Sequence, residues 1–136
     1  MNTYLDYYKK RITPKLQDID IFFRTLEEPN ENIHIDVVSE LLDLTPKEIR
    51  KIMKENDISY IHKNTFFMIM QNGSSFICKL FYRQLQAGLL TTYTPEKISY
   101  IYEIPEHIVT KAMQEADLPL VSSHNLEKLF SYIYID

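Results

Sequence analysis

One block of side chains recurs 60 residues after its first appearance, and this spacing constrains the fold more than any other feature. Four residues return unchanged: Lys51, Met53, Glu55 and Asp57 are matched by Lys111, Met113, Glu115 and Asp117. The apolar residues before them also correspond, with Val38, Leu41, Leu42 and Leu44 matched by Ile98, Ile101, Tyr102 and Ile104. Matching core and turn chemistry over this length indicates an internal duplication.

The first copy predicts two short helices joined by a tight turn. One helix is expected over 36–43, and Thr45-Pro46 opens another that runs to about Asn56. Thr45 and Glu48 have the spacing of a capping box. Ser39 is small where the helices would cross, and Asp43 stands at the turn, where a left-handed backbone is required. This pattern is typical of a helix-turn-helix, whose second helix enters the DNA major groove.

The second copy keeps this pattern and then diverges. Thr94-Pro95 opens its first helix, Ser99 is again small, and Glu103 takes the turn position. After the second helix, residues 58–70 of the first copy predict a β-hairpin, because aromatic and β-branched runs flank a short polar turn. The corresponding stretch of the second copy has helical spacing instead, through Leu126, Leu129, Phe130 and Ile133.

Other turn signals organise the rest of the chain. Thr13-Pro14 predicts a helix start. Residues 71–74 predict a break, and Ser74 or Ser75 caps a helix that runs to about Gly88. We therefore expect two parts. Residues 1–73 would hold the N-terminal helices and the first unit, and residues 74–136 a connecting helix and the second unit.

The order helix-turn-helix, hairpin and Ser-capped helix resembles the winged helix-turn-helix DNA-binding domains of MerR-type regulators and excisionases, in tandem duplicate. The resemblance is carried by Val38–Met53, Ile58–Ile69 and Ser75–Leu85. It implies a mainly α fold with two tandem helix-turn-helix (winged-helix-like) units and a short β-hairpin. It also implies a small sequence-specific DNA-binding protein, either a bacterial or phage transcriptional regulator or an excisionase-like factor. The wing tip departs from the MerR pattern, since it offers His62 and Lys63 where Arg is usual.

Four cations on the second helix of the first copy are the leading candidate contacts. Lys47, Arg50, Lys51 and Lys54 fall at i, i+3, i+4 and i+7, which places them on one outer stripe. Arg50 would read guanine and the lysines would hold phosphates. The alternative is a solvated helix face, in which Glu48 and Glu55 pair with these cations.

Further candidate contacts lie at the hairpin tip and in the second copy. Lys63 would reach the minor groove or the DNA backbone, although an ordinary turn explains it equally well. The matching face of the second copy carries one firm charge, so it would add little to affinity. Its residues are His107, Thr110, Lys111 and Gln114. A structural or partner-binding role competes for this face.

Composition excludes several classes of function. The net charge of −4 is shared about equally by the two parts, which argues mildly against nucleic acid. With only Gly73 and Gly88, there is no phosphate-binding glycine loop, and the four histidines are dispersed. Cys78 is the single cysteine. We expect no enzyme activity, cofactor or metal, no membrane span and a cytoplasmic location.

The expected partner is double-stranded DNA, with two alternatives left open. Ten tyrosines suit interfaces as well as core edges, so the N-terminal helix or the tail Tyr132–Ile135 would dock a second subunit in a homodimer. The other alternative is a protein-interaction module on the same scaffold, which binds and modulates a replication or transcription protein.

Overall fold

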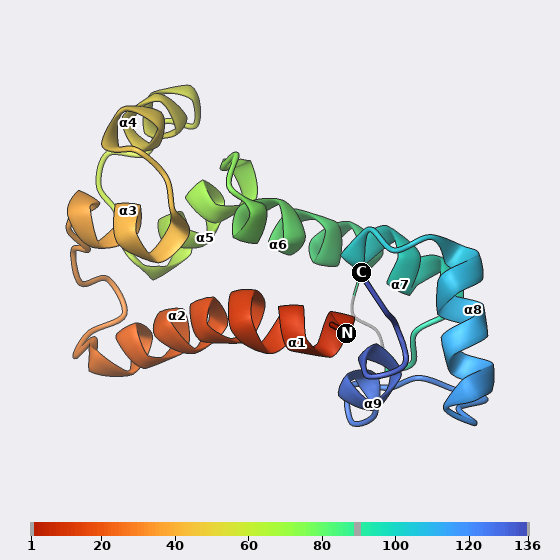
Figure 1. The fold of residues 1–136 in the computed structure, drawn as a ribbon. Helices are drawn as coiled ribbons and strands as arrows, with labels where there is room; N and C mark the ends of the chain where they lie inside the picture. The colour runs from red at the N-terminus through yellow and green to blue at the C-terminus, as the bar shows by residue number, and fades with distance from the viewer. Residues whose placement is uncertain (1, 89–90, 136) are drawn as a thin grey trace. The chain divides into compact units, whose positions relative to one another are not determined.

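The computed structural model of the chain describes residues 2–88 and 91–135, and these residues are mainly helical (Figure 1). In chain order the elements are α1 (Tyr4–Tyr7), the π-helix η1 (Tyr8–Ile12), α2 (Thr13–Thr25), α3 (Ile35–Leu42), α4 (Pro46–Glu55), α5 (Lys63–Asn72), α6 (Phe76–Ala87), α7 (Pro95–Tyr102), α8 (Glu106–Glu115) and α9 (Leu126–Phe130). Across this described part, extended pairing is limited to two isolated bridges, Thr3 with Tyr134 and Tyr93 with Val121. The expectation of a mainly α fold is confirmed.

The hairpin expected over 58–70 is wrong, because α5 begins at Lys63. Its start is fixed locally by Thr65, whose hydroxyl accepts the His62 amide at 2.8 Å and donates to the Tyr60 carbonyl at 3.1 Å. The buried side of α5 is formed by Phe66, Ile69 and Met70. The strand preference of aromatic and β-branched residues depends on context, and here a capped helix with a buried face prevails over it.

The α-helix α2 begins at Thr13, as expected from Thr13-Pro14, but it continues a helical stretch that already starts at Tyr4. Thr3 caps this helix, and its side chain accepts the Asp6 amide. A proline inside a helix lacks an N–H group and clashes with the preceding turn. The wide turn of η1, in which the Thr13 amide donates to the Tyr8 carbonyl, comes directly before Pro14 and lets the helix continue.

The turns of the backbone repeat with a spacing of 60 residues. Asp43 (φ 54°) ends α3 and Glu103 (φ 56°) ends α7, both with a left-handed backbone. A second left-handed residue follows each of the next helices, Asp57 after α4 and Asp117 after α8. Non-glycine residues seldom take this conformation, so four occurrences in two matching pairs mark equivalent turns.

The extended stretches repeat as well. The Ile33 amide donates to the Ile61 carbonyl at 2.7 Å, and the Tyr93 amide donates to the Val121 carbonyl at 2.7 Å. Asn125 holds the turn before α9 as Thr65 holds the turn before α5, since its side chain accepts the Ser122 amide at 2.7 Å and donates to the Leu120 carbonyl at 3.2 Å. Below, residues 33–73 are the first segment and residues 93–133 are the second segment.

The chain divides into two compact units, residues 14–82 and residues 1–13 with 83–136. The first segment lies in the former, here called the inner unit, and the second segment in the latter, the terminal unit. The boundary expected between residues 73 and 74 therefore falls inside the inner unit. Two contacts hold residues 74–82 there: Ser74 is bonded to Glu48, and the ring of Phe81 stacks on Phe67 at 5.8 Å between centroids.

Each unit has its own aromatic cluster. In the inner unit Phe23 meets Phe66 edge-on at 4.9 Å between centroids, and Phe66 is fully buried. In the terminal unit the buried Phe130 contacts Tyr4, Tyr8 and Tyr102, with centroid distances of 4.6, 5.2 and 5.0 Å. Residues 1–13 thus pack with the C-terminal part of the chain, and the Tyr4 amide donates to the Ile133 carbonyl at 2.7 Å.

Candidate nucleic-acid interface

α4 presents four exposed cations on one side. Its start is fixed by Thr45, whose side chain accepts the Glu48 amide at 3.1 Å, and by Pro46 at the first helical position. Ile49 and Ile52 are buried on the inner side. The outer side is exposed and consists of Lys47, Arg50, Lys51 and Lys54. These four residues are called the α4 basic face.

Carboxylates do not neutralise this face. Glu48 turns away from it, because its carboxylate accepts the Ser74 amide at 2.9 Å and the Ser74 hydroxyl at 2.8 Å. No carboxylate of residues 2–88 and 91–135 forms an ion pair with the α4 basic face. The pairing by Glu48 and Glu55, considered as an alternative from the sequence, is therefore not formed here. The four charges remain available to an anionic partner.

The turn before α4 is held from a second helix. Asp43 has the left-handed backbone that ends α3, and its carboxylate pairs with the Lys15 ammonium of α2 at 2.7 Å. Lys15 also donates to the Glu40 carbonyl at 3.1 Å. On the other side of the turn, the Ser39 hydroxyl donates to the Leu44 carbonyl. These bonds fix the direction in which α4 leaves α3.

Charge is segregated within the inner unit. Residues 14–45 contain eight acidic and two basic residues, whereas residues 46–63 contain three acidic and five basic residues. Both cations of the acidic stretch are paired, Lys15 with Asp43 and Arg24 with Asp20. The negative net charge of the chain therefore coexists with a local positive surface on α4.

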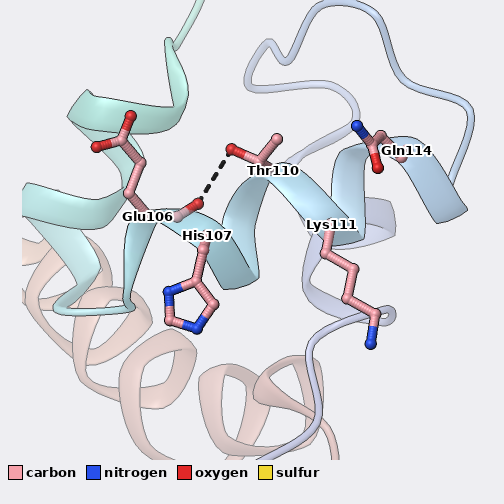
Figure 2. A pocket seen from close by; sticks show the side chains of 5 residues that line it. All are labelled: Glu106, His107, Thr110, Lys111 and Gln114. Carbon is pink, nitrogen blue, oxygen red and sulfur yellow. Dashed lines mark hydrogen bonds between the residues drawn. The ribbon is translucent and has the colours of Figure 1, made fainter.

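The corresponding side of α8 is nearly neutral. It holds His107, Thr110, Lys111 and Gln114, all exposed, and they line an open hollow of about 540 Å³ with Glu106 (Figure 2). His107 and Lys111 project to the same side of the helix, while the Thr110 hydroxyl bonds back to the Glu106 carbonyl at 3.1 Å. Lys111 lies 3.9 Å from the Glu115 carboxylate. All five residues come from one helix, so the hollow is an open surface.

Lys63 does not stand at a wing tip. It is the first residue of α5, and its ammonium lies over the Phe23 ring at 5.7 Å from the centroid. This placement follows from the replacement of the hairpin by a helix. Of the candidates from the first copy, the structure brings together the α4 basic face and sets Lys63 against α2.

One feature beside α4 was not expected. Residues 32–35 and 59–61 form an open hollow of about 290 Å³ together with Arg50 and Met53. Tyr60 stands at this hollow and is 42% exposed. The hairpin expected over 58–70 did not indicate this hollow, since a strand would place the side chains of Ile58 and Tyr60 on the same face. Ile58 and Ile61 are in fact the buried pair, and Ser59 and Tyr60 face outward.

The described residues offer little to other chemistry. Among them, no group of three or more metal-binding side chains comes together, and no helix is long and apolar enough to cross a membrane. Cys78 is fully buried, and burial raises the pKa of its thiol, which disfavours the reactive thiolate.

Comparison with known proteins returned no match to a family model, a curated protein sequence or a solved structure.

Proposed function

We propose that the protein binds double-stranded DNA through the α4 basic face, with α4 as the recognition helix of a helix-turn-helix. One observation carries the proposal: the face holds four exposed cations that pair with no carboxylate of the described residues, on a helix that follows a short left-handed turn. A solvated helix face would be expected to distribute its charges among acidic neighbours. Here Glu48, an acidic residue of the same helix, is bonded to Ser74 instead.

The four cations take different roles. Arg50 has the planar donors that recognise guanine in the major groove, whereas Lys47, Lys51 and Lys54 hold phosphates. By occupying a DNA site near a promoter or a recombination site, the protein would block or recruit the transcription or recombination proteins that act there. This is the mode of action of a bacterial or phage regulator or an excisionase-like factor. The second segment would form a tandem helix-turn-helix unit of lower affinity, because Lys111 is the single lysine or arginine of α8.

The negative charges of the inner unit refine this proposal. An acidic surface away from α4 repels DNA in every orientation except the one that turns α4 toward it. Such a protein should bind non-specific DNA weakly, and its specific binding should depend on a few phosphate contacts.

Selection from fragmented genomic DNA at near-physiological salt, followed by sequencing, tests the proposal. The wild-type protein should enrich a motif, and its length and symmetry would report whether one segment or two read bases and whether a homodimer binds. The variant Lys47→Gln/Lys51→Gln/Lys54→Gln should bind about 100-fold more weakly at 0.15 M salt, since each lost phosphate contact costs about fivefold. Arg50→Ala should relax the sequence preference instead.

A matched control removes equal charge elsewhere. Lys79→Gln/Lys97→Gln/Lys128→Gln neutralises three exposed lysines outside the α4 basic face. This control should retain most of the affinity and the wild-type motif. Equal losses in both triple variants would mean that overall charge, not α4, governs binding. Absence of any enriched motif together with weak, salt-labile binding would refute the proposal.

A second candidate is a protein-interaction module on the same scaffold. The observation that favours it is in the second segment, where Leu120 is 67% exposed beside the nearly neutral α8. An exposed apolar side chain with few neighbouring charges suits a protein partner better than a phosphate backbone. The partner would be a replication or transcription protein that this chain modulates.

A further inference from the structure

The hollow at Tyr60 differs in charge from the unit that contains it. Residues 14–82 hold eleven acidic side chains, yet none of the residues that line the hollow is Asp or Glu. Asn32, Ser59 and Arg50 contribute hydrogen-bond donors to its lining. Arg50 also belongs to the α4 basic face, so the hollow continues this face on one side of the helix.

The segment that carries Tyr60 is fixed at both ends. The Ile61 carbonyl accepts the Ile33 amide at 2.7 Å, and the Tyr60 carbonyl accepts the Thr65 hydroxyl at 3.1 Å. The phenol ring lies against the imidazole of His62, with 4.9 Å between centroids. Tyr60 is therefore an exposed aromatic side chain on a backbone held in place beside α4, which lowers the entropy cost of a contact.

We propose that this hollow holds one sugar–phosphate unit of a DNA strand that borders α4. Asn32 and Ser59 donate to the phosphate, and Arg50 supplies positive charge at the rim. Tyr60 packs on the deoxyribose, an uncharged contact. The inference rests on the proposed function and adds to it a neutral contact outside the recognition helix, at the position where the expected wing is absent.

The second segment provides the matched position. Leu120 corresponds to Tyr60 and is more exposed, at 67%. The matching hollow of the second segment has Thr110 in place of Arg50, and Asp117 adds a carboxylate to its lining. A phosphate is disfavoured there, and Leu120→Ala serves as the control for Tyr60→Ala.

The inference is tested by measuring how tightly the full chain binds a duplex from the genomic selection. The measurement is repeated over a range of salt concentrations. Tyr60→Ala should weaken binding about tenfold at every salt concentration. The salt slope should stay unchanged, because the variant loses no charged phosphate contact and binding releases the same number of counterions. Tyr60→Phe should retain the affinity, since the ring remains. Leu120→Ala should bind as the wild type does.

A second measurement changes the DNA and compares the wild-type protein with Tyr60→Ala. Phosphates of the duplex are replaced singly by uncharged methylphosphonates. Replacement of one phosphate beside the α4 contacts should lower the affinity of the wild-type protein. The loss should be smaller in Tyr60→Ala, because the phosphate contact and the Tyr60 contact involve the same nucleotide. If no linkage is coupled to Tyr60, or if Tyr60→Ala binds normally while Lys47→Gln/Lys51→Gln/Lys54→Gln loses affinity, this inference alone is overturned. If the wild-type protein binds no duplex, the proposed function fails with it.

Discussion

The two segments share a backbone and differ in what that backbone exposes. Ile49 on α4 and Val109 on α8 are both fully buried at the same inner position. On the outer side, Lys47, Arg50 and Lys54 are replaced by His107, Thr110 and Gln114. The inner positions and the left-handed turns determine the fold of each segment. The outer positions are free of that constraint, so one scaffold can carry two surfaces of different chemistry.

The segments also differ in how they are anchored. Position 70 of the first segment is Met and its counterpart 130 is Phe, and both are buried. Phe130 holds three tyrosine rings around it, two of them from residues 1–13. Met70 has no such role. The second segment therefore depends on a distant part of the chain, whereas the first segment packs against its sequence neighbours α2 and α6.

Phe130→Ala should have the largest effect on stability. Truncation of a buried Phe costs about 3–5 kcal/mol, because apolar contact is lost and a cavity remains. The cost should exceed that of Met70→Ala, since Phe130 also holds the N-terminal helix through Tyr4 and Tyr8. Urea denaturation of the two variants measures the difference. Equal destabilisation would mean that the aromatic cluster adds nothing to the anchoring of the second segment.

The tyrosines of this cluster provide a pH test of the same anchoring. Burial raises the pKa of Tyr4, Tyr8 and Tyr102 above the ordinary value near 10. The pKa of each phenol is higher in the folded state than in the unfolded state. The contribution of the neutral phenols to the free energy of unfolding is therefore complete below pH 10 and is lost as pH rises through the folded-state pKa. Spectrophotometric titration should show three phenols that ionise late. In Phe130→Ala their pKa values should move toward 10.

Local signals in the sequence predicted the helices α3, α4, α6 and α7 and all four residues of the α4 basic face. Thr45, Thr94 and the i, i+3, i+4 spacing act over a few residues, so they can be read without knowledge of the fold. α5 could not be predicted in this way, because its cap uses His62 and Thr65 and its sequence also suits a strand. The bond between Glu48 and Ser74 joins residues 26 apart and has no local signal.

The path of 58–62 is likewise set by a distant contact. The Ile33 amide holds Ile61, so the side on which Tyr60 emerges depends on residues before α3. Sequence reasoning therefore found the charged face, which lies on one helix, and missed the hollow, which two separate stretches form. The boundaries of the two units also depend on contacts between distant residues. The N-terminal helix joins the C-terminal part of the chain through the bond between Tyr4 and Ile133, more than 100 residues apart.

Transfer of charge from α4 to α8 should have the next largest effect. His107→Lys, Thr110→Arg and Gln114→Lys together would copy the α4 basic face onto α8. In a protein with Lys47, Lys51 and Lys54 neutralised, this graft should raise DNA affinity about 25-fold, because it adds two lysines at about fivefold per phosphate contact. Binding measured against salt should recover a slope of about three contacts. If affinity does not recover, the two segments differ in geometry as well as in charge.

Gly73→Ala should have an intermediate effect, confined to the first segment. A Cβ at this position would lie 2.5 Å from the Cys78 sulfur and 2.9 Å from the Leu44 Cδ1 atom. Overpacking of this kind costs about 1–3 kcal/mol. The counterpart of Gly73 is Ile133, which is buried at 1% exposure, so the second segment fills the same point with a large side chain.

Thermal denaturation of Gly73→Ala measures this cost, and Cys78→Ala provides the control. Removal of the sulfur in the background of Gly73→Ala should recover part of the lost stability, because the sulfur is the closest atom to the added methyl group. A double variant no more stable than Gly73→Ala would contradict steric overlap as the cause. It would point instead to the loss of glycine's backbone freedom, although the φ of −77° at Gly73 is ordinary.

The smallest effects are expected at the four non-glycine residues of the two segments that have a left-handed backbone, and they test whether the turns of the two segments are equivalent. Gly removes the steric cost of this conformation, so Asp57→Gly and Asp117→Gly should each stabilise the protein by about 0.5–1 kcal/mol. Asp43→Gly and Glu103→Gly should be near neutral, because the same gain is offset by loss of the pairs with Lys15 at 2.7 Å and Arg83 at 3.2 Å. Urea midpoints of all four variants decide the matter. Equal gains at all four positions would show that the ion pairs contribute nothing. A gain in only one segment would show that turns with the same backbone angles are held by different forces.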